Sequence, residues 1–167
     1  MLKTVTLFTL ATGIALATPA VSQDAPDFAD VIENRYFQQW RDTPEHPFSM
    51  EIAEQIYLTD DRLTALDTDA LAVPGADSRL EGWAEYAPIW PKAFEGISHF
   101  EPGEVRDLLV RLQGDWALVT FDMAGELELT DGTELDVFKH FTLVWVRTPD
   151  GWRIMHEHIS DGKSAAE

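Results

Sequence analysis

Residues 138–160 read FKHFTLVWVR-TPDG-WRIMHEHIS, and this stretch decides the fold. Two runs rich in β-branched and aromatic residues, 138–147 and 152–160, flank a Thr-Pro-Asp-Gly turn, a pattern typical of a β-hairpin. Successive side chains of a strand point to opposite faces. One predicted face therefore carries Trp152, Ile154, His156 and His158, and the other carries Arg153, Met155, Glu157 and Ile159. Two imidazoles beside apolar side chains indicate the wall of a small-molecule pocket.

The segments upstream predict helices first and strands afterwards. Helical spacing of apolar residues indicates a first helix over 27–41 and a short second helix over 49–57. A third helical stretch, 82–94, contains Pro88 and Pro91, which predicts a kinked helix or two short ones. Strands are predicted at 63–67, 105–112 and 116–129, with a bulge or bend at Gly125 and a hairpin turn at 130–133. Helices followed by an antiparallel meander predict the α+β class.

The amino-acid composition limits the classes of function that this protein can have. The chain has 167 residues, 45% of them apolar, which suits one packed domain, predicted over residues 23–167. Its formal net charge of −18 repels phosphate backbones and anionic lipid heads, so we expect neither nucleic acid nor a membrane surface as a partner. The absence of cysteine excludes disulfides, thiolate chemistry and cysteine-ligated metal.

The N-terminus has the pattern of a secretory signal peptide. Lys3 precedes an apolar run over 5–17, and small residues follow around Pro19. We therefore predict a signal peptide over residues 1–22, a periplasmic or secreted protein, and no membrane attachment after cleavage. A retained membrane anchor is the alternative, although the apolar run is short for a bilayer span.

Several segments resemble SnoaL-like proteins of the nuclear transport factor 2-like superfamily, which also holds ketosteroid isomerases and polyketide cyclases. The strand 151–160 is similar to the closing strand of that family, and weaker similarities lie at 82–83, 114–117 and 140–145. The resemblance implies a cone-shaped, curved antiparallel sheet wrapped around N-terminal helices, with a pocket inside and frequent dimerisation through the sheet. It implies no single reaction, because members include isomerases, cyclases, dehydratases and binders without activity.

Three residues are the predicted catalytic groups. His158 matches the histidine of the family's closing strand, and His140 occupies a position where relatives often carry a polar residue facing the pocket. An imidazole titrates near neutrality and can exchange a proton with a ligand. Asp122 lies in an apolar strand, where its pKa would rise. A packing role for the histidines and a solvent-facing Asp122 are the alternatives, and the catalytic hypothesis depends on inward-facing imidazoles.

Aromatic residues are the predicted pocket wall, with core packing as the alternative for each. The predicted ligand-binding residues are Tyr36, Trp40, Tyr57, Trp83, Trp90, Trp116 and His156. No cofactor is expected, because no glycine-rich nucleotide loop is present. No metal is expected either, although His140, His156 and His158 could together form a zinc site if the strands bring them together.

The sequence thus predicts an exported α+β protein, homodimeric, with an apolar pocket for a small hydrophobic molecule. The first hypothesis is an enzyme that performs cofactor-free proton transfer of the isomerase, cyclase or dehydratase type. The second is a non-catalytic ligand-binding protein of the cell envelope. The third is a dimerisation module whose pocket has lost its function.

Overall fold

A computed structural model describes residues 25–163, and the predicted signal peptide lies outside this range. The first helical segment runs continuously through α1 (Phe28–Val31), the π-helical turn η1 (Ile32–Tyr36) and α2 (Phe37–Trp40). Asp27 begins it, and its carboxylate accepts a hydrogen bond from the backbone N–H of Ala29 at 3.0 Å. This matches the helix predicted over 27–41, and its apolar stripe is buried.

The predicted short elements follow, together with a 3₁₀ turn and a second short strand that the sequence did not indicate. Helix α3 (Met50–Ile56) begins after Ser49, whose hydroxyl accepts from the Glu51 N–H at 3.2 Å. Strand β1 (Thr64–Asp67), the 3₁₀ turn η2 (Thr68–Ala72) and strand β2 (Arg79–Glu81) come next. Two short helices, α4 (Trp83–Tyr86) and α5 (Ile89–Phe94), occupy the proline-containing stretch. No helix in residues 25–163 is long and apolar enough to cross a bilayer.

Four long strands build most of the sheet. They are β3 (Ile97–Gln113), β4 (Trp116–Leu129), β5 (Glu134–Thr148) and β6 (Gly151–Asp161). They pair antiparallel in chain order, and the six-stranded sheet runs β2-β1-β6-β5-β4-β3. Strand β1 pairs parallel with β6, so the sheet is mixed rather than purely antiparallel. Strand β3 begins well before the predicted 105–112, because its first half pairs with the far end of β4.

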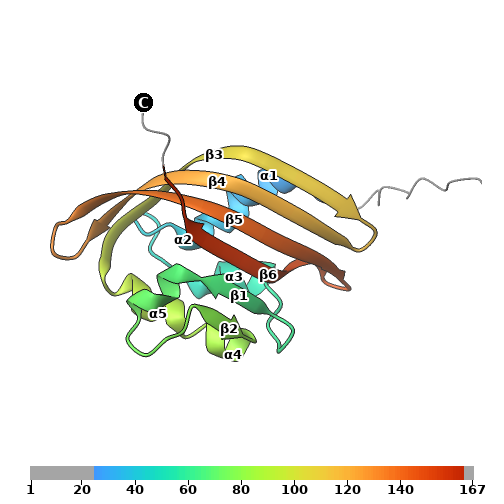
Figure 1. The fold of residues 1–167 in the computed structure, drawn as a ribbon, viewed down its shortest axis with the longest axis horizontal. Coiled ribbons are helices and arrows are strands. Elements are labelled where there is room, and N and C mark those ends of the chain that lie inside the picture. Colours follow the sequence, from blue (N-terminus) through green and yellow to red (C-terminus); the bar gives the residue numbers. More distant parts are fainter. Residues whose placement is uncertain (1–24, 164–167) are drawn as a thin grey trace, which may run out of the picture.

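The sheet curves over the helices, which lie against its inner face (Figure 1). Register shifts in the β3–β4 pair between Pro102 and Val105 and between Arg106 and Leu109 bend the outer strands. Gly125 lies at the first of these shifts, as predicted, and Gly103 approaches the neighbouring strand so closely that a Cβ would lie 2.5 Å from the Ala124 carbonyl oxygen. The curved α+β architecture predicted from the sequence is confirmed.

Candidate functional site

One extra residue in β6 decides which side chains face inward. In the β5–β6 ladder His156 lies opposite Val144 and Ile154 lies opposite Trp145, so Met155 has no partner and forms a β-bulge. Ile154 and Glu157 are consequently both fully buried, although they are three positions apart. The predicted strict alternation is therefore wrong beyond Met155, because a bulge exchanges the two faces of every residue that follows it.

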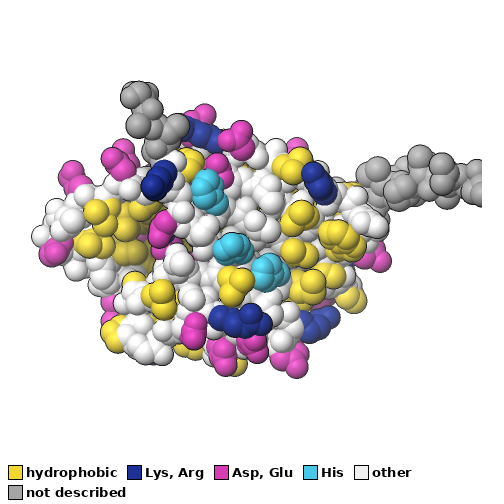
Figure 2. Space-filling model, viewed as in Figure 1, with side chains coloured by type: hydrophobic (Ala, Val, Ile, Leu, Met, Phe, Trp, Pro, Cys, Tyr) yellow, Lys and Arg dark blue, Asp and Glu magenta, His cyan; other side chains and the backbone are white. Residues whose placement is uncertain are grey.

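The histidines lie on the outer face of the sheet. His158 is exposed, and the side chain of His140 is 49% exposed. His156 is half-buried, with its Nδ1 atom 2.7 Å from the Thr64 hydroxyl, and burial together with the neighbouring His158 lowers the pKa of His156. Figure 2 shows histidine side chains at the surface of this face. The expected inward orientation of the imidazoles is wrong.

His140 and Asp122 form a pair on this outer face. They are direct cross-strand neighbours in β5 and β4, with 2.7 Å between His140 Nδ1 and Asp122 Oδ1. Their predicted catalytic role, and that of His158, stays a prediction that the outward position disfavours. Within residues 25–163 no three histidine or carboxylate side chains come close enough to hold a metal ion, so the three-histidine alternative has no assembled site.

Glu157 occupies the inner face of β6 and is fully buried among three tyrosines. The hydroxyl of Tyr36 donates to Glu157 Oε2 at 2.7 Å, that of Tyr86 donates to Oε1 at 2.8 Å, and that of Tyr57 also donates to Oε2. Burial raises the pKa of Glu157, and the three hydroxyl groups partly offset this by stabilising the carboxylate. Burial, followed by the charge of Glu157, raises the pKa of each tyrosine. This network places an ionisable group at the centre of a largely apolar core.

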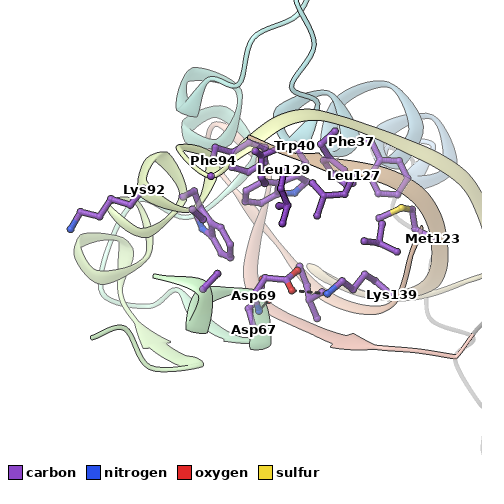
Figure 3. Close-up of a pocket in the computed structure, with 18 of the residues that line it drawn as sticks. Phe37, Trp40, Asp67, Asp69, Lys92, Phe94, Met123, Leu127, Leu129 and Lys139 are labelled. Carbon is purple, nitrogen blue, oxygen red and sulfur yellow. Dashed lines mark hydrogen bonds and ion pairs between the residues drawn. The ribbon is translucent and has the colours of Figure 1, made fainter. Parts of the chain in front are cut away.

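A cavity of about 420 Å³ lies between the inner face of the sheet and helices α2 and α5. Most of its wall is apolar, from aromatic side chains such as Phe37 and Phe94 and aliphatic ones such as Met123 and Leu127 (Figure 3). In Figure 2, hydrophobic side chains gather around a hollow beside the β4–β5 hairpin end, where residues of this wall lie. The size and lining are those of a site for a small organic molecule.

Asp67 is the buried carboxyl group of this cavity. It ends β1, where it is 1% exposed, and its Oδ1 atom accepts a hydrogen bond from the Asp69 N–H at 2.8 Å. Its Oδ2 atom is buried without a partner among the described residues. Burial is the main cause that raises the pKa of Asp67 well above its usual value, and the charges of Asp69 and Glu157 add to it. The raised pKa favours the neutral form of this carboxyl group relative to an exposed aspartate.

Lys139 supplies the cationic side of the cavity. Its ammonium group lies 2.6 Å from the Asp69 carboxylate and 2.6 Å from that of Asp161, and Figure 3 shows the contact with Asp69 across the cavity. Burial alone would lower the pKa of Lys139, but the carboxylates of Asp161 and Asp69 outweigh it, so the pKa is raised. Lys139 therefore stays charged and anchors η2 to β5 and the end of β6.

Two of the predicted pocket aromatics line the cavity, namely Trp40 and Trp90. The other predicted aromatics lie elsewhere: Tyr36 and Tyr57 bind Glu157, Trp83 packs against Tyr86, and Trp116 is 43% exposed. Sequence reasoning missed Asp67 and Glu157. For Asp67 a signal existed, because it follows the buried Leu63 and Ala65 at alternate positions and so shares their face.

Comparison with known proteins gives the family. The SnoaL-like domain matches residues 50–162, and no curated protein matches the sequence. A Kribbella flavida protein superposes with a TM-score of 0.63 at 18% identity, covering 82% of this chain and 91% of that one. A nuclear transport factor 2-like protein of Salmonella enterica gives 0.61 at 18% identity, covering 80% and 88%.

A protein of Thiobacillus denitrificans, named for a calcium/calmodulin-dependent protein kinase type II association domain, gives a TM-score of 0.55 at 21% identity and covers 81% and 92%. At these identities the solved structures show the fold alone. The domain match spans more than half of the sequence and confirms the resemblance carried by residues 151–160. The chain belongs to the SnoaL-like domain family, on a nuclear transport factor 2-like fold.

Proposed function

We propose that this protein binds a small hydrophobic organic molecule in its cavity and exchanges a proton with it without a cofactor, as an isomerase, cyclase or dehydratase does. The observation that carries the proposal is Asp67, which lines this apolar cavity and whose Oδ2 atom is buried without a hydrogen-bond partner among residues 25–163. Asp67 takes the role that the sequence suggested for the histidines of the outer face.

Asp67 suits proton transfer because of its surroundings. A carboxyl whose pKa lies near the working pH gives and takes a proton with comparable ease. Burial raises the pKa of Asp67 in that direction. In its ionised form it takes a proton from a ligand carbon, and the bond between that proton and Oδ2 forms as the carbon–hydrogen bond breaks. The neutral acid then returns the proton to another ligand atom, so the cycle needs neither an oxidant nor a reductant.

The cavity supports a catalytic role over pure binding. An apolar wall lowers the local polarity and so strengthens the charge interactions beside it. A carboxyl oxygen buried without a partner costs about 1–3 kcal/mol of stability when no ligand is bound, and a raised pKa suits the Asp67 carboxyl group to proton exchange as well as to binding. Proton exchange with a ligand would give this destabilising group a function.

Deuterium exchange tests the proposal. The probe is 2-indanone, a bicyclic ketone with acidic hydrogens beside its carbonyl group, incubated with the protein in D₂O and followed by NMR. We expect the folded wild type to accelerate exchange and Asp67→Asn to lose at least about 100-fold of that acceleration, the scale of a general base. Asp122→Asn makes the same chemical change on the outer face and should keep the rate.

If Asp122→Asn lost the accelerated exchange and Asp67→Asn kept it, the proton transfer would belong to the outer-face pair of Asp122 and His140. Binding of the ketone without any accelerated exchange would leave a ligand-binding protein. Mass spectrometry of molecules carried through purification would then identify the class of ligand.

Export and self-association complete the proposal. The N-terminal pattern of residues 1–22 supports export to the periplasm or the medium. N-terminal sequencing of the protein from the cell envelope should begin after Ala20 or Ser22; an intact Met1 would contradict it. The association domain among the structural neighbours is compatible with a homodimer. Light scattering during size-exclusion chromatography should give twice the chain mass, and a monomer mass would contradict this part.

A further inference from the structure

Two histidines of β6 lie next to each other on the outer face of the sheet. His156 and His158 are separated only by Glu157, which is buried on the inner face. Both come after the bulge at Met155, so their imidazoles share one face, with Cα atoms about 6.6 Å apart at the usual rise of a strand. Figure 2 shows histidine side chains gathered in the middle of this face. The pair is therefore separate from the cavity, which lies against the inner face.

The two rings influence each other electrostatically, as expected for close neighbours. Burial is the first cause that lowers the pKa of His156, and the charge of His158 is the next. Arg79 is a smaller cause, and its guanidinium group is paired with the Glu81 carboxylate at 2.9 Å. The two imidazoles thus form a close pair of nitrogen ligands.

Thr64 orients the imidazole of His156. It lies opposite His156 in the parallel β1–β6 ladder, and its hydroxyl oxygen is 2.7 Å from His156 Nδ1. When Nδ1 carries the proton and donates it to this hydroxyl, the lone pair of Nε2 is left free. In metal sites the second ring nitrogen of a histidine is usually held by an oxygen atom in this way, which fixes the ring and its tautomer. The contact gives His156 the surroundings of a metal ligand.

The backbone that carries the pair is fixed by the sheet. Strand β6 pairs with β1 on one side and with β5 on the other, so the two histidines do not lie at a sheet edge. Ligands held on such a strand lose little conformational freedom when they bind an ion. Because each ring rotates about its own side-chain bonds, both can approach one ion to the metal–nitrogen distance of about 2.0–2.1 Å.

The ligand set selects the class of ion. Within residues 25–163 no third histidine or carboxylate is close enough to complete a three-ligand group, so the protein supplies two nitrogens and water fills the other positions. Imidazole suits Cu²⁺, Ni²⁺ and Zn²⁺, whereas Mg²⁺ and Ca²⁺ prefer oxygen ligands. The formal net charge of −18 attracts cations of every kind, and the two nitrogens then distinguish among them.

We propose that His156 and His158 form a binding site for one divalent transition-metal ion on the outer face of β6, with Thr64 as the positioning residue of His156. The site binds Cu²⁺ most tightly, as the general order of first-row ions requires, and does not select Mg²⁺ or Ca²⁺. It is independent of the proton transfer proposed for Asp67, because the cavity lies on the opposite face of the sheet.

Calorimetric titration with Ni²⁺ tests the site, on protein without a histidine tag and with excess Mg²⁺ to occupy the acidic surface. We expect one Ni²⁺ ion per chain. His156→Ala and His158→Ala should each weaken binding at least about tenfold, because only one imidazole is left. Thr64→Val should weaken it about tenfold, and Thr64→Ser, which keeps the hydroxyl, should restore it. The control His46→Ala removes an exposed imidazole from a loop and should keep the wild-type affinity.

The variant His158→Ala decides the outcome, because His158 is exposed and its removal leaves the core intact. Unchanged Ni²⁺ affinity in this variant would overturn the proposal, and so would an equal loss in His46→Ala. Binding of Ni²⁺ no tighter than that of Mg²⁺ would assign the ions to surface carboxylates and would overturn it as well. Electron paramagnetic resonance of bound Cu²⁺ gives a second readout. Imidazole nitrogen couplings should be present in the wild type and absent from the variant that lacks both histidines, and couplings that persist there would place the ion elsewhere.

Discussion

The two faces of strand β6 place titratable groups in opposite environments, one buried and one exposed. On the inner face Glu157 is fully buried, and three tyrosine hydroxyls satisfy its carboxylate. On the outer face His158 is exposed one position later. The unpaired residue Met155 alone sets which of the two looks inward. The chemical suitability of a residue for catalysis therefore does not predict which face of a strand it occupies. Here a one-residue β-bulge decides which titratable side chain faces the interior.

Insertion of one alanine between His156 and Glu157 should have the largest effect, because it moves every later residue of β6 by one position. Glu157 and Ile159 would then turn to the outer face, and His158 would have to be buried. We expect loss of cooperative unfolding and of near-ultraviolet circular dichroism. Met155→Ala keeps the residue count and should unfold cooperatively, with a loss of about 1–2 kcal/mol from a half-buried side chain. An insertion variant as stable as Met155→Ala would show that position along β6 does not fix the faces.

Substitution of Glu157 comes next. Glu157→Ala leaves three buried hydroxyl groups without their acceptor, and we expect a loss of about 3–5 kcal/mol in urea unfolding. Glu157→Gln should lose less, because one oxygen can still serve the two tyrosines that share Oε2 while only Tyr86 faces an amide donor. The exposed control Glu134→Ala should change stability by less than about 0.5 kcal/mol. Equal stabilities for Glu157→Ala and the control would contradict the network.

A pH titration of stability distinguishes Asp67 from surface carboxylates. Its native pKa is raised, so above the unfolded value of about 3.9 the native state holds a proton that the unfolded chain has released. The free energy of unfolding therefore falls as pH rises through this window, until the native group ionises as well. Asp67→Asn should make that fall less steep and should gain stability relative to the wild type as pH rises from 4 to 7.

Glu157 contributes a slope of the same sign, so the Asp67→Asn variant keeps part of the fall. The exposed control Asp77→Asn should reproduce the wild-type slope in urea unfolding across the same range. If Asp67→Asn and Asp77→Asn respond alike, the carboxyl of Asp67 is not the buried acid that the cavity geometry indicates.

The sequence was sufficient for the fold but not for the site, and β6 shows why. Apolar periodicity, capping residues and the turns located the helices, three of the four long strands and the second half of β3, because these signals are local. The bulge at Met155 depends on the partner strand, so no local pattern reveals it. The burial of Asp67 depends on β1 pairing with β6, 92 residues further along the chain. The meeting of Tyr36, Tyr57 and Tyr86 at Glu157 also joins residues far apart in the sequence.

The smallest effect is expected for His140→Ala on the outer face. Its imidazole is half exposed, and its contact with Asp122 is a surface pair worth about 0–1 kcal/mol. Stability should change by less than about 1 kcal/mol, and exchange of 2-indanone should proceed at the wild-type rate in the same NMR assay. Because the cavity and His140 lie on opposite faces of β5, a fall in exchange without a fall in stability would mean that the outer face takes part in the chemistry. Both faces of β5 would then carry residues that take part in the chemistry.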